Sequence, residues 1–354
     1  MLDTLSIQTQ RTANSRLSEI DMDNIEFGKV FSDHMFRVDF VDGAWQQPQI
    51  LPYGDISMSP AISALHYGQA IFEGMKAYRQ ADGGVALFRP TDNAARLNSS
   101  AERMCMPTIP EELFMNGLRE LIKLDSDWVP AAAGSALYIR PFMFATDGFI
   151  GVRPSRNYRF MIFTCPVNAY YTQPLRSRFE KHYVRSAPGG AGYAKNAGNY
   201  GAAMYPTKQA TDAGYHNLIW TDATKHEFVE ESGTMNIIFN IDGKLITPAV
   251  STTILDGITR RSVLQLARDW GMPVEERPVS SHEVMQAIRD GKLQEAFGVG
   301  TAATIAPIAT ISYEDQDYDL PALTDESFSR RVGKALDDIR TGRAADPHGW
   351  MEQV

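Results

Sequence analysis

Residues 186–207 read SAPGGAGYAKNAGNYGAAMYPT, and Lys195 is the only charged side chain among them. A lysine among small, closely packing residues loses solvation, which lowers its pKa and leaves more of the amine neutral and nucleophilic. Such an amine can form a Schiff base with a carbonyl compound. The competing interpretation is a lysine that extends to the surface from a Gly-rich loop. Asn199 and Tyr200 follow at short spacing, and the glycines let a phosphate-sized group approach the backbone, which favours the nucleophile.

The length and composition indicate a globular protein. The chain has 354 residues, enough for two domains of roughly 100 to 200 residues each. Hydrophobic residues make up 44% and charged residues 22%, which excludes disordered and collagen-like classes. A formal net charge of −9 provides no basic surface for a phosphate backbone or an anionic membrane. We therefore expect no nucleic-acid partner.

The cysteines and the N-terminal sequence bear on the compartment. Cys105 and Cys165 are the only cysteines and form no C-x-x-C pair, so the sequence contains no disulfide framework. The first residues carry Asp3 and no apolar core, unlike a secretory signal. No apolar run approaches the roughly 20 residues that cross a bilayer. These features predict a cytoplasmic protein with no membrane partner.

Hydrophobic periodicity predicts a mixed α/β (α+β) protein in two domains. Predicted strands cover 36–41, 75–79, 85–88, 135–144, 158–167, 217–220, 226–231 and 236–241. Predicted helices cover 94–104, 258–270, 281–290 and 325–340, and another opens at Pro110. Thr91 and Asp92 are the expected caps of the helix over 94–104.

The domain boundaries follow from a break in this pattern. Residues 168–178 are neither periodic nor strongly apolar, and we interpret them as the interdomain loop. The N-terminal domain is then 1–167, and the C-terminal domain is 179–354. The first 30 or so residues are polar, and little order is expected there.

The pattern G-x-x-x-A-K-x-x-x-N-Y, from Gly190 to Tyr200, resembles the cofactor-lysine segment of fold-type IV aminotransferases. The resemblance covers almost the whole chain and is similar in order and spacing to the branched-chain amino acid aminotransferases. The other matching segments are FGKVFSDHMF (27–36), LHYGQAIFEGMKAYR (65–79), LFRPTDNAARLNSSAERMCMP (87–107), ALYIRPFMF (136–144), EESGTMNIIF (230–239), LDGITRRSVL (255–264) and FGVGTAATIAPI (297–308).

This resemblance implies a fold, a cofactor and a reaction. The implied fold has a smaller N-terminal and a larger C-terminal domain, with pyridoxal phosphate between them and attached to Lys195. The implied reaction is a ping-pong transamination of leucine, isoleucine and valine with 2-oxoglutarate, which gives branched 2-oxo acids and glutamate. Amino acids and 2-oxo acids are thus the expected small-molecule partners.

Pyridoxal phosphate acts as an electron sink only while its ring nitrogen stays protonated, so the protein must supply a negative partner. In the family this is the glutamate of E-x-G-T-x-N, which falls on Glu231. A solvated carboxylate at a strand end is the competing interpretation, and Glu230 is adjacent. The spacing to Gly233 and Asn236 favours Glu231.

Other cofactor contacts are also implied by the resemblance. A phosphate dianion favours an arginine, amides at a helix N-terminus and hydroxyls. The family pattern assigns Arg96, the amides of Ile258 and Thr259, and Thr301 to the phosphate. Tyr200 resembles the tyrosine that binds the cofactor's phenolic oxygen. Without the resemblance, Arg96 is an exposed arginine on an amphipathic helix and Tyr200 a packing residue.

The substrate contacts centre on Y-x-R at Tyr138–Arg140. An inward arginine on an apolar strand is costly unless it meets an anion. We predict that Arg140 binds the γ-carboxylate of glutamate and that the amides of Thr301 and Ala302 bind the α-carboxylate. Arg140 could instead bind the α-carboxylate or only brace the strand. Further pocket positions implied by the resemblance are Phe27, Tyr67, Phe72, Tyr138, Tyr170 and Thr234.

The loop DGFIGVRPSR (147–156) resembles the segment that reaches into the partner's active site, with Val152 closing the pocket. This implies a homodimer. The chain departs from some animal members at one point, because Ala303 and Ala306 stand where those members carry a C-x-x-C redox pair. Thiol control at that position is not expected.

Three other interpretations compete. Residues 298–303 satisfy G-x-G-x-x-A, with Asp317 near the acidic position of a nicotinamide-binding motif, but Pro307 interrupts the helix that such a motif requires. A D-amino acid aminotransferase or an aminodeoxychorismate lyase would share the fold, and the Y-x-R strand with the GTAA turn argues against both. A regulator that only binds cofactor would leave Lys195 and Glu231 without a role.

Overall fold

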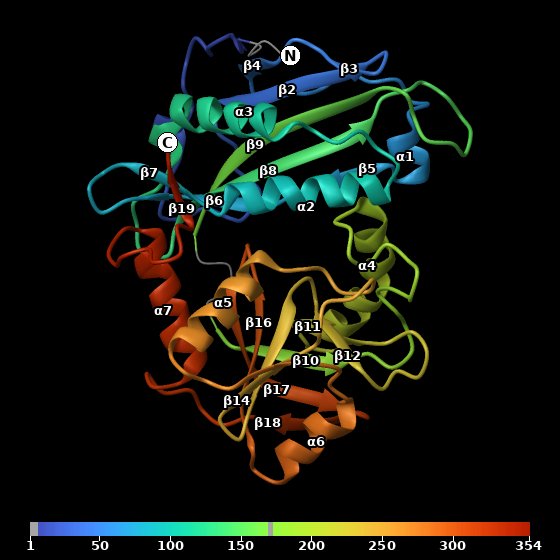
Figure 1. The fold of residues 1–354 in the computed structure, drawn as a ribbon, viewed down its shortest axis with the longest axis vertical. Helices are drawn as coiled ribbons and strands as arrows, with labels where there is room; N and C mark the ends of the chain where they lie inside the picture. Colours follow the sequence, from blue (N-terminus) through green and yellow to red (C-terminus); the bar gives the residue numbers. More distant parts are fainter. Residues whose placement is uncertain (1–5, 169–172) are drawn as a thin grey trace. The chain divides into compact units, whose positions relative to one another are not determined.

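The computed structural model describes residues 6–168 and 173–354, which form two units, each built on its own sheet (Figure 1). The first unit comprises the described residues of Met1–Tyr170 together with Ala194–Ala197 and Asp337–Val354. The second comprises the described residues of Tyr171–Tyr193 and Gly198–Leu336. The mixed α/β class predicted from the sequence is confirmed. None of the helices in the described ranges is both long and apolar enough to cross a membrane.

A 10-stranded sheet organises the first unit. Its order is β1-β4-β2-β9-β8-β6-β7-β19, with β3 beside β2 and β5 beside β8. The strands are β1 (Gln8–Thr9), β2 (His34–Val41), β3 (Ala44–Trp45), β4 (Gln49–Pro52), β5 (Ala70–Phe72), β6 (Met75–Arg79), β7 (Val85–Phe88), β8 (Ala136–Ala145), β9 (Tyr158–Val167) and β19 (Met351–Gln353). Its central strands β2, β9, β8 and β6 pair antiparallel.

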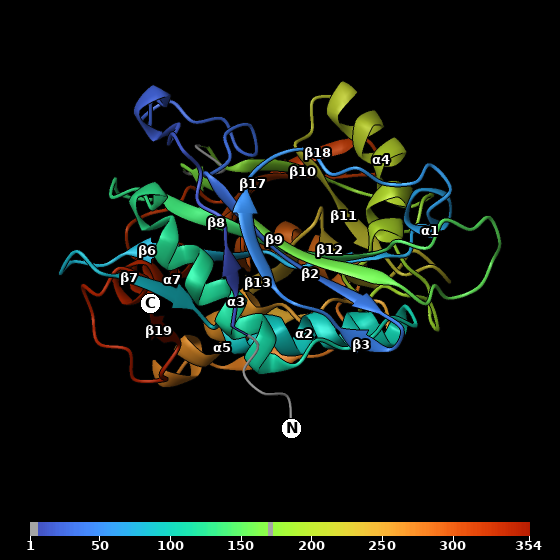
Figure 2. The same ribbon diagram turned by 90° about the horizontal axis from the view of Figure 1, so that it is seen from above.

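Two amphipathic helices cover one face of this sheet. They are α2 (Pro90–Arg103) and α3 (Glu111–Leu124), which lie on the same side of it (Figure 2). The aromatic rings of Phe114 on α3 and Phe160 on β9 lie 5.6 Å apart, and Phe36 on β2 packs against Phe160. Their burial supplies much of the core, at roughly 25 cal/mol per Å² of apolar surface. The shorter helices of this unit are η1 (Leu17–Glu19), α1 (Ser63–Tyr67) and η2 (Ser126–Trp128).

The C-terminal residues belong to a different unit from the one that the sequence predicted. The sequence prediction placed 179–354 in one domain, whereas Asp337–Val354 belongs to the first unit. The physical reason is strand pairing, because β19 runs antiparallel to β7 and opposite Phe88 at Met351 (Figure 1). Such a long-range pairing of a three-residue strand has no local sequence signal.

The second unit contains a 9-stranded sheet in the order β12-β11-β10-β17-β16-β13-β14-β15, with β18 beside β17. The strands are β10 (Leu175–Phe179), β11 (Asn217–Thr221), β12 (Val229–Ser232), β13 (Asn236–Ile241), β14 (Lys244–Thr247), β15 (Val274–Glu276), β16 (Leu293–Gly300), β17 (Thr304–Tyr313) and β18 (Gln316–Asp319). The helices are α4 (Ala197–Asp212), α5 (Ile258–Asp269), α6 (Ser281–Arg289) and α7 (Phe328–Arg340), of which α4 and α7 each run across a unit boundary.

Three local expectations are wrong. The segment 168–178 was interpreted wholly as a loop, but Leu175–Phe179 forms β10, which pairs in parallel with β11 and β17. The helix predicted over 94–104 begins at Pro90, with Arg89 in the left-handed conformation at its N-cap and no capping side chain. The capping prediction for Thr91 and Asp92 is wrong as well.

The G-x-G-x-x-A pattern is not a nucleotide-binding turn. β16 and β17 pair antiparallel through Gly300 and Thr304, so a strand follows where that motif needs a helix. The glycines serve packing instead, since a Cβ on Gly298 would lie 2.6 Å from the Cε of Met235. The nicotinamide interpretation is therefore excluded.

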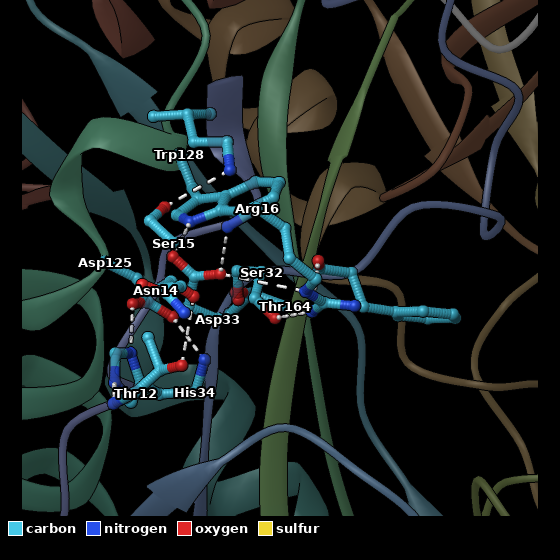
Figure 3. Close-up of polar contacts among 12 residues, drawn as sticks. Thr12, Asn14, Ser15, Arg16, Ser32, Asp33, His34, Asp125, Trp128 and Thr164 are labelled. Atoms are coloured by element: carbon cyan, nitrogen blue, oxygen red, sulfur yellow. Dashed lines mark hydrogen bonds and ion pairs between the residues drawn. The ribbon is translucent and has the colours of Figure 1, made fainter. Parts of the chain in front are cut away.

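The described part of the N-terminal segment, from residue 6 onward, is more ordered than its polarity predicted. Figure 3 shows it held by buried polar groups of the first unit. The Asp33 carboxylate accepts hydrogen bonds from the Arg16 amide (3.0 Å) and the Trp128 indole (2.9 Å). His34 Nδ1 lies 2.6 Å from Asp125, and its Nε2 accepts a hydrogen bond from the Thr12 amide (2.9 Å). These contacts fix the segment that leads into β2.

The hydrogen bonds of the Asp33 carboxylate should contribute to the stability of the folded protein. Burial acts to raise the pKa of Asp33, but hydrogen bonds from Ser15, Arg16 and Trp128 outweigh it and hold the pKa below the usual 3.8. Asp33→Asn should therefore cost about 1 to 3 kcal/mol of unfolding free energy at neutral pH. The cost should shrink as the pH falls below 3.8, because a lowered folded-state pKa stabilises only above that range.

Urea denaturation of the cofactor-free protein measures this difference. The control is Asp39→Asn, since Asp39 pairs with Arg159 in a partly exposed ion pair (2.6 Å) and should cost under about 1 kcal/mol. Equal losses of unfolding free energy in the two variants would contradict the assignment. So would a loss in Asp33→Asn that does not change with pH.

Candidate active site

The backbone of Lys195 is fixed within the first unit. Its amide donates to the Ser100 hydroxyl on α2 (2.9 Å), and its carbonyl accepts from the Phe72 amide at the end of β5 (3.0 Å). The next residue, Asn196, bridges to Ile71 in the manner of a short strand. The lysine side chain extends from this anchored segment, with Nζ 4.9 Å from the centre of the Phe72 ring.

The predicted substrate residues of β8 gather around the same phenylalanine. Arg140 Nη2 donates to the Tyr138 hydroxyl (2.8 Å), and the guanidinium lies 4.6 Å from the Phe72 ring centre. Phe27 meets Tyr138 edge-on, with ring centres 5.3 Å apart. The Nε of Arg140 is buried and has no hydrogen-bond partner in the described part of the chain. A buried, unsatisfied guanidinium nitrogen is suited to an anionic ligand.

Arg96 lies one turn before Ser100 on α2. Its guanidinium forms a two-pronged ion pair with Glu73, through Nε (2.7 Å) and Nη2 (2.8 Å). Glu73 is fully buried and follows Phe72 directly. The pair therefore fixes the guanidinium on the part of α2 that also binds the Lys195 backbone.

Two other predicted substrate residues are exposed, and a third is not described. Tyr67 ends α1 and is 41% exposed, and Val152 is 90% exposed in the loop 147–156. Tyr170 falls outside the described residues. The structure thus brings Phe27, Phe72, Tyr138, Arg140 and Lys195 together.

In the second unit, the motif Glu231–Asn236 binds a single residue from both sides. The Glu231 carboxylate accepts a hydrogen bond from the Leu255 amide (2.8 Å), and the Asn236 amide donates to the Leu255 carbonyl (2.9 Å). Glu231 lies on β12 and is 3% exposed. The spacing of E-x-G-T-x-N follows from this, since the tight turn between β12 and β13 directs both side chains at one peptide segment. Thr234 lies exposed in that turn.

Leu255 leads directly into the N-terminus of α5. Gly257 is the N-cap, with no capping side chain, and Ile258 and Thr259 in the first turn are buried. A Cβ on Gly257 would lie 1.9 Å from the Asn236 side-chain oxygen, so no other residue fits. An uncapped helix N-terminus presents amide donors and a positive dipole end, which suit a phosphate.

The remaining predicted residues of the second unit lie on separate elements. Thr301 and Ala302 occupy the turn that joins β16 to β17. Tyr200 lies in the first turn of α4, where Asn199 donates to the Ala191 carbonyl (2.8 Å). This contact ties the start of the helix to the Gly-rich segment that precedes it.

Sequence reasoning missed Arg185, which lies beside Glu231. Its Nε is 3.3 Å from the Glu231 carboxylate, and the two side chains are 9% and 5% exposed. Arg185 also donates to the carbonyls of Thr253, through a short hydrogen bond, and Gly192 (3.4 Å). The signal available in the sequence was an arginine next to the segment 186–207, where Lys195 is the only charged side chain, but the partner of Arg185 lies 46 residues away in the chain.

Glu230 adds a second carboxyl to this part of the site. Burial is the main cause that raises the pKa of Glu230 to about 7, and the neighbouring Glu231 and Asp222 charges act in the same direction. Contact with Thr253 and the charge of Arg185 oppose that shift. A carboxyl with such a pKa is largely protonated in mildly acidic solution.

Comparison with known proteins agrees with these observations. The family model for amino-transferase class IV matches residues 70–311. A branched-chain-amino-acid aminotransferase of Bacillus subtilis is 42% identical over 94% of this chain and 93% of its own length. One from Mycolicibacterium smegmatis is 41% identical over 99% and 98%.

A solved structure extends the agreement to the fold. A branched-chain amino acid aminotransferase solved in complex with N-(5'-phosphopyridoxyl)-L-glutamate is 26% identical and covers 89% of this chain and 97% of its own, with a TM-score of 0.72. The chain therefore belongs to the class IV aminotransferases and, within them, to the branched-chain amino acid aminotransferase family. It is a transferase with the fold-type IV architecture.

Proposed function

We propose that the chain uses pyridoxal phosphate to transfer amino groups between branched-chain L-amino acids and 2-oxoglutarate. The observation that carries the proposal is the position of Lys195. Its backbone is anchored, and its amine and the Arg140 guanidinium both lie near the Phe72 ring. The named activity of the relatives and the phosphopyridoxyl ligand of the solved aminotransferase support the cofactor and the substrate class.

The residues present fit this cofactor. Pyridoxal phosphate needs an amine for its carbonyl, an anion for its ring nitrogen and donors for its phosphate. Lys195 is the amine, and Glu231, a buried carboxylate, is the anion. The uncapped start of α5, with Ile258 and Thr259, supplies donors for the phosphate, and Arg96 and Thr301 are further candidates. Tyr200 is proposed for the phenolic oxygen.

When bound, pyridoxal phosphate withdraws electrons from the substrate's α-carbon, which makes the α-proton acidic. In our proposal, Lys195 Nζ accepts that proton and returns it to the neighbouring carbon of the cofactor, as general base and then general acid. Glu231 holds the proton on the ring nitrogen. The anchored backbone limits the positions that Nζ reaches, which keeps the transfer at one centre.

The substrate contacts must serve an aliphatic side chain and a γ-carboxylate in turn. Phe27, Phe72 and Tyr138 offer apolar surface, and each buried CH₂ contributes roughly 0.8 kcal/mol. Arg140 supplies the charge for glutamate and 2-oxoglutarate, consistent with its unsatisfied Nε. The amides of Thr301 and Ala302 are proposed for the α-carboxylate. Tyr67, Tyr170 and Thr234 are proposed to complete the pocket.

We propose also that the enzyme is a cytoplasmic homodimer. The loop 147–156 exposes Phe149 (42%), Ile150 (60%) and Val152 (90%), a concentration of apolar surface suited to a second copy of the chain. Cys105 and Cys165 are both free thiols, in keeping with a reducing compartment.

The first prediction concerns the cofactor lysine. Borohydride reduction of the protein after incubation with pyridoxal phosphate should fix the cofactor's mass on Lys195, because its amine is the one placed for the cofactor carbonyl. Peptide mass mapping locates the modification. Lys208, exposed on α4 and paired with Asp212 (2.7 Å), is the internal control and should stay unmodified. Modification of Lys208 or Lys181 in place of Lys195 would refute the assignment.

The second prediction concerns Arg140. Arg140→Leu should weaken the half-reaction with glutamate by about 10- to 150-fold, the loss of a charge-assisted hydrogen bond of about 1.5 to 3 kcal/mol. The half-reaction with leucine should change much less, because leucine has no γ-carboxylate. Single-turnover kinetics with each amino acid measure the two effects.

The matched control for Arg140 is Arg159→Leu. Arg159 lies on the neighbouring strand β9 and pairs with Asp39, so its loss should leave both half-reactions nearly unchanged. An equal loss on leucine and glutamate in Arg140→Leu would show that Arg140 does not serve the γ-carboxylate.

A further inference from the structure

Arg185 lies beside the buried carboxylate of Glu231 on β12. Its Nε lies 3.3 Å from Glu231, and its charge also acts on Glu230. Both glutamates are at most 5% exposed. The positive charge of Arg185 thus acts on both Glu230 and Glu231, where little water reaches the carboxyls.

Physical chemistry restricts which charge states this arrangement allows. A buried carboxylate without a counter-charge takes up a proton, and two neighbouring carboxylates disfavour each other's ionisation. Glu230 is the acid that is neutral in mildly acidic solution, because burial, together with the charges of Glu231 and Asp222, raises its pKa to about 7. The carboxylate that pairs with Arg185 is then Glu231.

We propose that Arg185 is a positioning residue that keeps Glu231 ionised and directed at the cofactor's ring nitrogen. The proposal rests on the proposed function, since it assumes that Glu231 meets that nitrogen. Arg185 acts through Glu231 and does not touch the cofactor itself. Without it, Glu231 would bind its own proton and would lose the charge that holds the proton on the ring.

The contacts of the segment 253–255 support this role. The Thr253 carbonyl accepts a hydrogen bond from Arg185, and the Leu255 amide donates to Glu231. The same short segment therefore binds both members of the ion pair. A Cβ on Gly192 would lie 2.6 Å from the Thr253 carbonyl oxygen, so the Gly-rich segment packs closely against the residue that accepts from Arg185.

A purely structural role is the alternative. In that case Arg185 would matter only because it binds the carbonyls of Thr253 and Gly192, and its removal would loosen the segment whatever the charge of Glu231. The two roles differ in one measurable property, the energetic coupling between Arg185 and Glu231. A double-mutant cycle isolates that coupling.

The experiment measures the dissociation constant of pyridoxal phosphate by absorbance titration at about pH 6, below the pKa of about 7 of Glu230. Four proteins form the cycle: wild type, Arg185→Met, Glu231→Gln and the double variant. In the wild-type background, Arg185→Met should weaken binding by about tenfold or more. In the Glu231→Gln background, where no carboxylate remains to be held, it should weaken binding by about threefold or less.

Two further comparisons serve as controls. In a Glu230→Gln background, Arg185→Met should again weaken binding about tenfold, because Glu230 is already neutral. Arg185→Lys keeps the charge and should bind the cofactor within about threefold of wild type, which keeps the proposal testable if Arg185→Met fails to fold. The pH dependence of the bound cofactor's absorbance should shift in the same direction in Arg185→Met and Glu231→Gln.

Equal weakening by Arg185→Met in the wild-type and Glu231→Gln backgrounds would overturn the proposal and leave a structural role. A loss of tenfold or more in Arg185→Lys would do the same. Failure of the wild-type protein to bind pyridoxal phosphate would instead overturn the proposed function. The two failures are therefore distinguishable.

Discussion

A carboxylate buried away from water is the constraint on which the second unit depends. Glu231 is 3% exposed, and its charge is compensated by the Leu255 amide and the Arg185 guanidinium. These partners fix the segment before α5, and Asn236 fixes the same segment from the other side through the Leu255 carbonyl. The position of the helix N-terminus thus follows from satisfying one buried charge.

The first unit obeys a comparable rule at its own reactive side chain. The lysine amine must stay near one position to transfer a proton, although the lysine side chain has about four rotatable bonds. The protein restricts the backbone instead, with the Phe72 amide and the Ser100 hydroxyl binding both sides of Lys195. The buried pair of Arg96 with Glu73 fixes α2 against the end of β5 at the same place.

The sequence predicted many of the longer regular elements because their hydrophobic periods are strong. The strands predicted at 75–79 and 85–88 and the helix predicted at 281–290 agree with the structure within a residue. The failures have physical causes. α4 contains glycines and Pro206, so its helical propensity is low. β19 owes its existence to pairing with β7, a contact between residues far apart in the chain.

The candidate site was predictable where a motif encodes a local contact and not where it depends on tertiary pairing. The spacing of Glu231 and Asn236 is local, because both side chains bind Leu255 across one turn. Arg185 and Glu73 were missed because each is defined by a distant partner, Glu231 and Arg96 respectively. The family roles of Lys195, Glu231 and Arg140 remain proposals that follow from the resemblance and from this geometry.

The most direct test of the account is a panel of amino donors with 2-oxoglutarate as acceptor. The purified protein, saturated with pyridoxal phosphate, is assayed for glutamate formation with L-leucine, L-isoleucine, L-valine, L-aspartate and D-alanine. The account predicts rapid formation of glutamate and the matching branched 2-oxo acids with the three branched L-amino acids, and little with the other two donors. Turnover that favours D-alanine, or no turnover with any branched donor, would contradict it.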